Sequence, residues 1–355
     1  MVRTLAALGH QVELLTYAQG EPLELPGVVH RRSLALPVGR VRAGPSLAKL
    51  VLDLPFLAQA VLLLMTRRYD VVHAVEEATH LIAPFARLRG VPLLADVDSS
   101  IPEQLRESGF ARRGPLLWAA EGLEGYALRR AAGVVTVCRS LSDAVRRRVP
   151  GAPVFQIEDP PLLDAAAPAP ELVAALRSSL GLGPGAVVLY TGNFEPYQGV
   201  GLLVAAAAAV PEAQFLFVGG EPAEIASFKR QAAGRCVFAG KRPPSELPQL
   251  LALADVLVSP RLRGSNTPFK VYTYLASGTP LVATRIESHT QLLDGTLAFL
   301  VEATVEGLAG GVREALSDAA AARQRAERGR ALVAREYSAD RFREKVAAAY
   351  STLGS

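Results

Sequence analysis

Short apolar runs alternate with longer amphipathic segments along most of the chain. The runs are rich in Val, Leu and Ile and end at Gly, Pro or polar residues, which is typical of strands buried in a parallel sheet. A segment of helical length follows most runs, so the pattern predicts parallel strands joined by crossover helices. The predicted strands are 12–17, 28–36, 70–74, 91–95, 134–137 and 154–157, then 186–191, 214–219, 236–239, 254–259 and 281–284.

A proline- and alanine-rich segment, 159–171, separates the two sets of strands and has the composition of a linker. A chain of 355 residues is also longer than one hydrophobic core usually covers. We therefore predict an α/β fold of two doubly wound parallel-sheet domains, 1–160 and 161–340, which face each other across a cleft. Residues 341–355 form the end of a final helical segment, 319–353, which is interrupted near 337–340.

The opening of the chain departs from this scheme. Residues 1–9 have a helical pattern, whereas a parallel α/β domain normally begins with a strand and a glycine-rich turn. We therefore expect an upstream segment that carries the missing strand.

Two later helices are predicted in the first half of the chain. Residues 50–65 predict an apolar helix that is interrupted by Asp53 and Pro55 and is too short to cross a bilayer. Ser140 is the expected cap of a later helix.

Composition narrows the possible partners. The calculated isoelectric point near 9.2 is a mild basic bias that suits phosphates or an anionic membrane. No aromatic residues interleave with the arginine runs 67–68, 112–113, 129–130 and 146–148, so we expect no nucleic-acid partner. Cys138 and Cys236 lie in apolar runs and are expected to be buried free thiols of a reducing compartment. The sequence has no cluster of His and Cys residues that would predict a metal site, and we expect no cofactor.

Residues 261–284 carry the strongest candidate site. Thr267 is an expected N-cap with Pro268 at the first helical position, and Gly278 followed by Pro280 ends this helix. A helix N-terminus after a strand offers free N–H groups, and three cations lie near it: Arg261, Arg263 and Lys270. Such a place binds an anion, most naturally a phosphate, although an ordinary solvated loop fits the same spacing.

Three more loops with glycines follow predicted strands of the second half. They are 191–199 (TGNFEPYQG), 218–222 (VGGEP) and 240–244 (GKRPP). A glycine after a strand is ordinary turn chemistry when it stands alone. Four such loops at the same edge of one sheet favour a ligand site.

The order of motifs resembles that of family-4 glycosyltransferases, retaining enzymes of the GT-B fold. The second half carries TGNFEPYQG, FLFVGGEP, VFAGKRPPSELPQLLALADVLVSP and SNTPFKVYTYLASGTPLVAT, and the first half carries LAALGHQVELLTY, YDVVHAVEEATH, GVPLLADVDSSIPEQL and AAGVVTVCRSLSD. The resemblance implies an acceptor domain, a nucleotide-sugar donor domain and a final helix that crosses back to the first domain. It also implies that a first strand and glycine-rich loop precede Met1.

The chain departs from the family pattern at the charged donor positions. Two glutamates, on the donor sugar and the ribose, correspond to Ser265 and Thr273 here. An arginine and a lysine on the diphosphate correspond to Asn193 and Gln198. Hydroxyls and amides form hydrogen bonds without neutralising a phosphate. The resemblance therefore implies a variant subgroup whose positive charge comes from Lys270, Arg261 or Arg263, or a chain that has lost the activity.

We assign candidate residues on this basis. The catalytic candidates are His73, Asp98 and Lys270, with His73 and Asp98 toward the acceptor. A buried satisfied histidine and a helix-capping aspartate are the alternatives for the first two. The donor-binding candidates are Gly192, Asn193, Gln198, Gly199, Gly220, Glu221, Lys241, Arg242, Arg263, Ser265, Asn266, Thr267 and Thr273.

The expected activity is transfer of a sugar from a nucleotide-diphosphate donor to a glycan or lipid-linked acceptor, with retention of configuration. The nucleotide sugar is a co-substrate, and no metal is expected. Two alternatives remain: a sugar-nucleotide-binding protein without catalysis, and a nucleotide-sugar epimerase of the same fold. We expect a cytoplasmic protein of polysaccharide biosynthesis, either free or peripheral at the inner face of an anionic membrane, held by its arginine pairs and residues 50–65.

Overall fold

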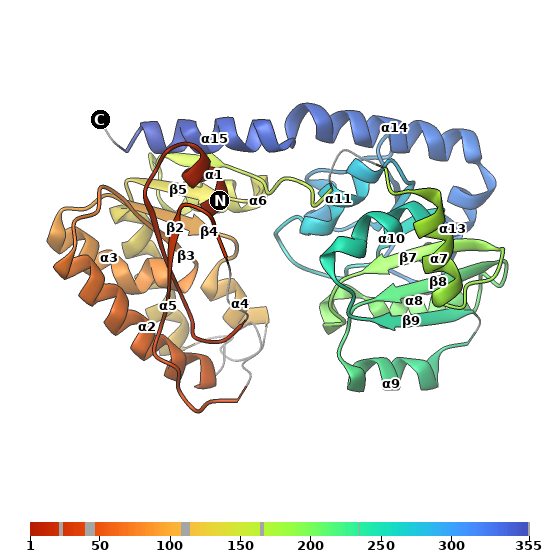
Figure 1. Ribbon diagram of the computed structural model, residues 1–355, viewed down its shortest axis with the longest axis horizontal. Coiled ribbons are helices and arrows are strands. Elements are labelled where there is room, and N and C mark those ends of the chain that lie inside the picture. Colours follow the sequence, from red (N-terminus) through yellow and green to blue (C-terminus); the bar gives the residue numbers. More distant parts are fainter. Residues whose placement is uncertain (21–23, 40–46, 108–113, 164–166, 234, 354–355) are drawn as a thin grey trace. The chain divides into compact units, whose positions relative to one another are not determined.

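A computed structural model describes residues 1–20, 24–39, 47–107, 114–163, 167–233 and 235–353. The chain forms two compact units, one made of Met1–Glu158 with Phe342–Ser355 and the other of Asp159–Arg341. Both units are α/β structures with parallel sheets, as predicted (Figure 1). The arginine pair Arg112–Arg113 lies outside the described residues.

Unit 1 holds two parallel sheets, β1-β2 and β3-β4-β5-β6. Its strands are β1 (Val12–Thr16), β2 (Val28–Arg32), β3 (Val72–Val75), β4 (Leu93–Val97), β5 (Gly133–Thr136) and β6 (Val154–Gln156). Its helices are α1 (Val2–Ala7), α2 (Leu47–Thr66), α3 (Glu77–Arg89), α4 (Ile101–Glu107), α5 (Pro115–Arg130), α6 (Arg139–Arg148) and most of α15 (Ala339–Ser351).

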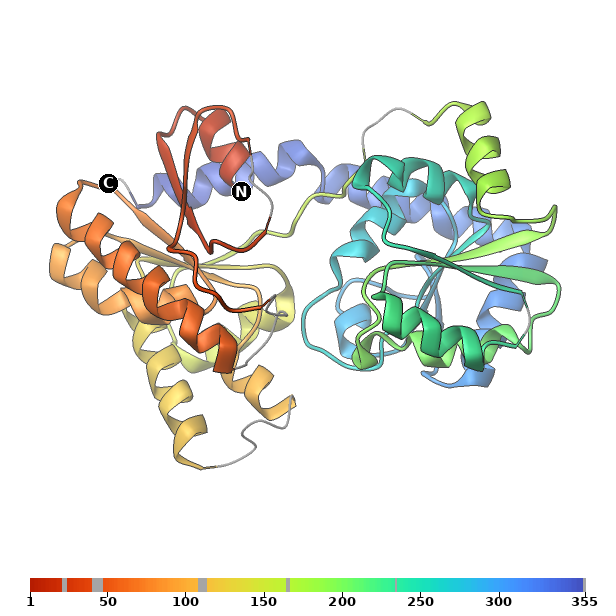
Figure 2. The same ribbon diagram turned by 60° about the horizontal axis from the view of Figure 1, so that its bottom comes forward.

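Helices cover both faces of the four-stranded sheet of unit 1. On one face, α3 lies between α2 and α5 and contacts both (Figures 1 and 2). On the other face, Leu5 of α1 and Phe342 and Val346 of α15 pack against Leu94 and Val135. The end of the chain thus completes the core of unit 1, because the apolar side of α15 covers strands that would otherwise be exposed.

Unit 2 is a single six-stranded parallel sheet in the order β12-β11-β10-β7-β8-β9. Its strands are β7 (Ala186–Thr191), β8 (Ala213–Val218), β9 (Cys236–Gly240), β10 (Val256–Ser259), β11 (Leu281–Thr284) and β12 (Phe299–Val301). Its α-helices are α7 (Pro170–Ser179), α8 (Val200–Ala207), α9 (Pro222–Gln231), α10 (Leu247–Leu253), α11 (Phe269–Ser277), α12 (Glu287–Thr290), α13 (Val305–Ser317) and α14 (Ala319–Glu336). Two 3₁₀ turns are η1 (Pro196–Gln198) and η2 (Pro244–Glu246).

The central strands of unit 2 are buried on both faces, which explains their continuous apolar runs. Along β7, Val188 and Tyr190 belong to one core cluster, whereas Val187 and Leu189 belong to the cluster on the other face. This alternation fixes the register, because a shift by one residue would exchange the two faces.

Three predictions about helices are wrong. Helix α2 runs through Asp53 and Pro55 without interruption. The N-cap of α11 is Pro268, so Thr267 lies one residue before the cap and Pro268 precedes the first helical residue, although Gly278 ends the helix as predicted. Ser140 lies inside α6, whose N-cap is Cys138. The short edge strand β12 was not predicted. Cys138 is buried and Cys236 is only partly buried, and both are free thiols.

Candidate functional site

The strand order of unit 2 changes direction between β7 and β10. The strands β8 and β9 extend the sheet on one side of β7, and β10, β11 and β12 extend it on the other. The loops after β7 and β10 therefore diverge at the carboxyl edge, where doubly wound sheets leave a crevice for ligands. A cavity of about 430 Å³ lies there, lined by Leu162, Thr191, Gly192, Asn193, Tyr197, Gln198, Leu247, Arg261, Asn266, Pro268, Phe269, Lys270, Thr273 and Tyr274.

Lys270 reaches this cavity from the first turn of α11. Its Nζ donates to the backbone oxygen of Thr191 at 3.1 Å and lies 3.9 Å from the centroid of the Tyr190 ring. Burial, helped by the positive charge of Arg261, lowers the pKa of Lys270 to about 7. Since an amine in such a position changes charge near neutral pH, an anion entering the cavity would favour its charged form.

Arg261 is the second cation of the cavity, and its guanidinium organises the loop that follows β10. It donates to the backbone oxygens of Arg263 and Asn266 at 2.8 Å each and to Asn266 Oδ1 at 2.9 Å. Its guanidinium carbon also lies 5.3 Å from the centroid of the Tyr197 ring. Arg261 therefore shapes the cavity wall, and its charge adds to that of Lys270.

The loop after β7 contributes amides and close backbone approaches. Gln198 is buried, and its Oε1 has no hydrogen-bond partner within the protein. The backbone oxygen of Asn193 accepts a hydrogen bond from Tyr190 Oη at 2.6 Å. Gly199 has φ 72°, and a Cβ there would lie 1.9 Å from the backbone oxygen of Pro260. Only glycine therefore fits where the two loops meet.

Two hydroxyl side chains of α11 complete the wall. Tyr274 Oη accepts the N–H of Thr191 at 2.8 Å and lies 2.9 Å from Thr191 Oγ1. Thr273 Oγ1 accepts the N–H of Leu162 at 3.2 Å. Among the described lining residues none is a carboxylate, so the cavity is polar with a net positive character.

Eight predicted donor residues lie outside the cavity lining, including Gly199, where the two loops meet. Lys241 and Glu221 form an ion pair at 2.5 Å, and Arg242 pairs with Glu246 at 2.7 Å. Arg263 is exposed to solvent. The other three predicted residues are Gly220, Ser265 and Thr267. Gly220 packs against Phe194, the backbone oxygen of Ser265 accepts from Gln291 Nε2, and Thr267 is buried with its hydroxyl unpartnered.

In unit 1 the predicted His73 has partners on both ring nitrogens. Nε2 lies 2.9 Å from Asp96 Oδ2, and Nδ1 lies 2.7 Å from Tyr350 Oη of α15. The carboxylate can only accept, so Nε2–H donates to Asp96 and Nδ1 accepts from the tyrosine hydroxyl. Both acid and histidine are largely buried. His73 therefore joins α15 to the sheet, which is close to the satisfied histidine considered from sequence.

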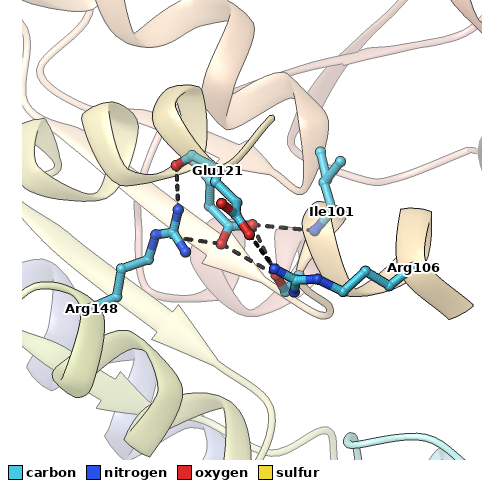
Figure 3. A network of polar contacts seen from close by, with 6 residues as sticks. Ile101, Arg106, Glu121 and Arg148 are labelled. Carbon is cyan, nitrogen blue, oxygen red and sulfur yellow. Dashed lines mark hydrogen bonds and ion pairs between the residues drawn. The ribbon is translucent and has the colours of Figure 1, made fainter. Parts of the chain in front are cut away.

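Asp98 follows β4 in a loop that ends at Ile101, where α4 begins. Ile101 belongs to a network of polar contacts with Arg106, Glu121 and Arg148 nearby (Figure 3). Glu124 of α5 holds this loop. Glu124 is buried, and its Oε2 accepts from Ser100 Oγ at 3.1 Å and from the N–H of Ile101 at 3.2 Å. Arg148 Nε lies 3.9 Å from Glu124 Oε1, and burial raises the pKa of this carboxyl. Thus Glu124 satisfies the N-terminus of α4, a role that the sequence suggested for Asp98 with its serine neighbours.

Several lining residues escaped the sequence analysis. Tyr197 lay inside a predicted loop and Tyr274 one turn beyond Lys270, so the spacing alone could have found both. Leu162 and Leu247 come from separate elements and carry no chemical signal of their own. Tyr350 is separated from His73 by 277 residues, and no local pattern joins them.

Two family models match the chain. Residues 1–160 match the model "Glycosyl transferase 4-like domain", and residues 185–318 match "Glycosyl transferases group 1". A 2-deoxystreptamine glucosyltransferase of Streptomyces kanamyceticus is 30% identical over 313 residues, which cover 80% of this chain and 78% of that protein. A GDP-mannose-dependent alpha-(1-6)-phosphatidylinositol monomannoside mannosyltransferase of Mycolicibacterium smegmatis is 31% identical over 223 residues. That match spans 57% of this chain and only 58% of the mannosyltransferase.

Solved structures support the fold. A sucrose-phosphate synthase from Thermosynechococcus elongatus superposes with a TM-score of 0.80 at 22% identity, covering 99% of this chain and 91% of the synthase. Anabaena HepE in complex with UDP and glucose gives a TM-score of 0.79 at 18% identity, with 99% and 94% covered. These structures are GT-B glycosyltransferases built from two Rossmann-like domains, so the predicted fold class is confirmed.

Proposed function

Because the chain belongs to the group 1 glycosyltransferases with a 4-like N-terminal domain, we propose that it transfers a sugar from a nucleoside-diphosphate donor with retention of configuration. The observation that carries this proposal is the cavity at the switch point of unit 2. There Lys270, Arg261 and the first turn of α11 surround a space of about 430 Å³ without a carboxylate among its described lining residues. Cations and helix N–H groups in that arrangement suit a diphosphate.

In the proposed sugar transfer, the main task of the protein is to stabilise the leaving group. As the bond between the sugar C1 and the diphosphate oxygen breaks, negative charge develops on the diphosphate. An acceptor hydroxyl forms the new bond to C1, and its proton leaves with the nucleoside diphosphate. Charged Lys270 would stabilise that developing charge in a largely buried site, where the interaction is stronger than in water.

We propose that polar uncharged groups take the places that other family members fill with charges. Gln198 has an unpartnered amide oxygen in the cavity, and Asn193 and Thr273 offer further hydrogen-bonding groups to the phosphates or ribose. These groups orient the donor without neutralising it. The compensating charge then comes from Lys270 and Arg261. The positions of Lys241, Arg242 and Glu221 outside the cavity lining favour a peripheral role for these three residues.

The acceptor site belongs to unit 1 in this proposal, at the carboxyl edge of its sheet. Asp98 follows β4 there, in the loop that Glu124 holds. His73 is engaged by Asp96 and Tyr350, so we assign it the positioning of α15 rather than a step of the reaction. The acceptor would be a glycan or a lipid-linked sugar, and the protein would work at the cytoplasmic side of an anionic membrane. The relatives, which include a phosphatidylinositol mannoside mannosyltransferase, support this class of acceptor.

Release of nucleoside diphosphate from labelled UDP- and GDP-sugars tests the function. The purified chain should slowly hydrolyse one of the donors without acceptor. NMR should show that the released sugar has the same anomeric configuration as the sugar in that donor. Lys270→Met should abolish release, whereas Lys229→Met, on the exposed side of α9, should not. Binding of donor without release would favour the non-catalytic alternative. Epimerised sugar nucleotide would favour the epimerase.

A further inference from the structure

Helix α2 is oriented with its charged residues toward the protein. Lys49 Nζ pairs with Glu77 Oε1 of α3 at 2.5 Å, and Asp53 accepts a hydrogen bond from the hydroxyl of Tyr17, which follows β1. Tyr17 Oη also donates to Glu77 at 3.2 Å. Burial raises the pKa of Asp53. These are the charged residues of the helix, and they lie on its inner side together with buried Leu52 and Leu64.

The opposite side of α2 is apolar and exposed to solvent. Leu54 and Leu62 are 68% and 60% exposed, and Val51 and Met65 are also exposed. Together with exposed Ala58 they are spaced by three or four residues, so they lie along one side of the helix. A surface helix normally carries polar residues on the side that faces water, and only its inward stripe is apolar. A continuous exposed apolar stripe of this kind indicates a surface that something covers.

Arginines surround the end of this stripe. Arg67 and Arg68 follow α2, and Arg87 lies in the last turn of α3 beside Leu88, which is 72% exposed. A hydrogen bond from Arg89 Nε to the backbone oxygen of Leu64, at 3.2 Å, brings the two helix ends together. Parallel strands start at one edge of the sheet, so the last turns of α5 and α6 end at that edge too. They add Arg129, Arg130, Arg146 and Arg147, whereas Arg148 is turned toward Glu124.

We propose that this outward side, the α2 face (Val51, Leu54, Ala58, Leu62, Met65 and Leu88), lies flat on an anionic lipid surface. Its apolar side chains would enter the headgroup region while Arg68 and Arg87 contact lipid phosphates, and Arg67 stays paired with Glu13. The exposed described side chains of α2 include no carboxylate, so a second copy of the helix would offer these arginines no counter-charge. Among the described residues no helix is long and apolar enough to cross a membrane. The proposal rests on the membrane location proposed above, and it names the surface of the protein that contacts the membrane.

Co-sedimentation of the full chain with vesicles tests the α2 face. We expect binding to phosphatidylcholine mixed with phosphatidylglycerol, little binding to phosphatidylcholine alone, and a marked loss at high salt. The double variant Leu54→Glu/Leu62→Glu should reduce the partition coefficient roughly tenfold or more, since two leucines no longer leave water. Leu172→Glu is the matched control, because Leu172 is 54% exposed on α7 of unit 2. Arg68→Glu/Arg87→Glu should also weaken binding, and Arg230→Glu/Arg323→Glu, two exposed arginines of unit 2, should not.

Three outcomes would overturn the proposal. They are equal binding to neutral and anionic vesicles, no binding to either, and a dimer in solution that Leu54→Glu/Leu62→Glu separates into monomers. The last result would make a second copy the occupant of the face. Donor hydrolysis measured on the same variants separates this proposal from the sugar transfer, because the α2 face and the donor cavity lie in different units. If a variant lost vesicle binding but kept donor hydrolysis, the result would concern the α2 face and not the proposed sugar transfer.

Discussion

The amine of Lys270 lies 3.9 Å from the centroid of the Tyr190 ring, above a tyrosine that is completely buried at the end of β7. The ring face and the backbone oxygen of Thr191 both attract the ammonium form. Burial and Arg261 oppose it and prevail, so that the pKa of Lys270 falls to about 7. The residue is thus partly charged at neutral pH, and an anionic ligand would complete its protonation.

Replacement of Lys270 tests its contact with the diphosphate. We expect Lys270→Ala to weaken UDP or GDP binding by roughly 1.5–3 kcal/mol, the contribution of a hydrogen bond to a charged group. Isothermal titration calorimetry measures the change, and Lys229→Ala is the control on exposed α9. Unchanged affinity in Lys270→Ala would remove this lysine from the donor site.

Binding of the nucleoside diphosphate should also be accompanied by uptake of a proton. Above pH 7 the free protein carries mostly neutral Lys270, whereas the diphosphate complex carries the ammonium form, so affinity should fall as pH rises through this range. Well below pH 7 the lysine is charged in both states, and this dependence should vanish. Calorimetry at pH 8 in buffers of different ionisation enthalpy should detect most of one proton entering per ligand. Identical enthalpies in all buffers would exclude a proton-linked Lys270, and Lys270→Met should give that result.

The sequence was informative where one local pattern decides the structure. Buried parallel strands have continuous apolar runs, so five of the six strands of unit 2 were predicted, and two of them, 186–191 and 281–284, with the observed bounds. Edge strand β12 has only three residues and lacks that signal. Pro268 shifted the start of α11 because its φ and ψ suit the position before the helix as well as the first turn.

The donor cavity was partly predictable for a similar reason. Glycine-bearing loops after parallel strands meet at one edge, which brought Gly192, Asn193, Gln198 and Lys270 into one predicted site. The direction of a side chain is decided by tertiary contacts, so the same rule misplaced Lys241, which forms an ion pair with Glu221. The pairing of His73 with Tyr350 depends on where the last helix packs, and it has no local signature.

Gly199 should tolerate no side chain. Its φ is 72°, and an added Cβ would lie 1.9 Å from the backbone oxygen of Pro260, so one of the two cavity loops would have to move. We expect Gly199→Ala to lower the free energy of unfolding by roughly 2 kcal/mol or more. Gly310→Ala is the control, because Gly310 lies within α13 with open space around it and alanine favours helix by up to about 1 kcal/mol. Equal stability of the two variants in urea denaturation would contradict the close approach.

Glu124 should make folding pH-dependent in a direction opposite to that of most carboxyls. Burial raises its pKa above 4.5, so between 4.5 and that raised value the folded protein binds more protons than the unfolded chain. The free energy of unfolding should therefore decrease as pH rises through that window, and Glu124→Gln should remove this contribution.

The hydrogen bonds of Glu124 have a separate effect that two further variants isolate. A glutamine at 124 keeps an acceptor for Ser100 and Ile101, whereas Glu124→Ala leaves both donors without it and should cost about 1–3 kcal/mol at neutral pH. Glu121→Gln on the same helix removes only the partly exposed pair with Arg106 and should change stability by less than about 1 kcal/mol. Urea denaturation from pH 5 to 8 measures all three variants. If Glu124→Ala were as stable as Glu121→Gln, the N-terminus of α4 would not depend on this carboxylate.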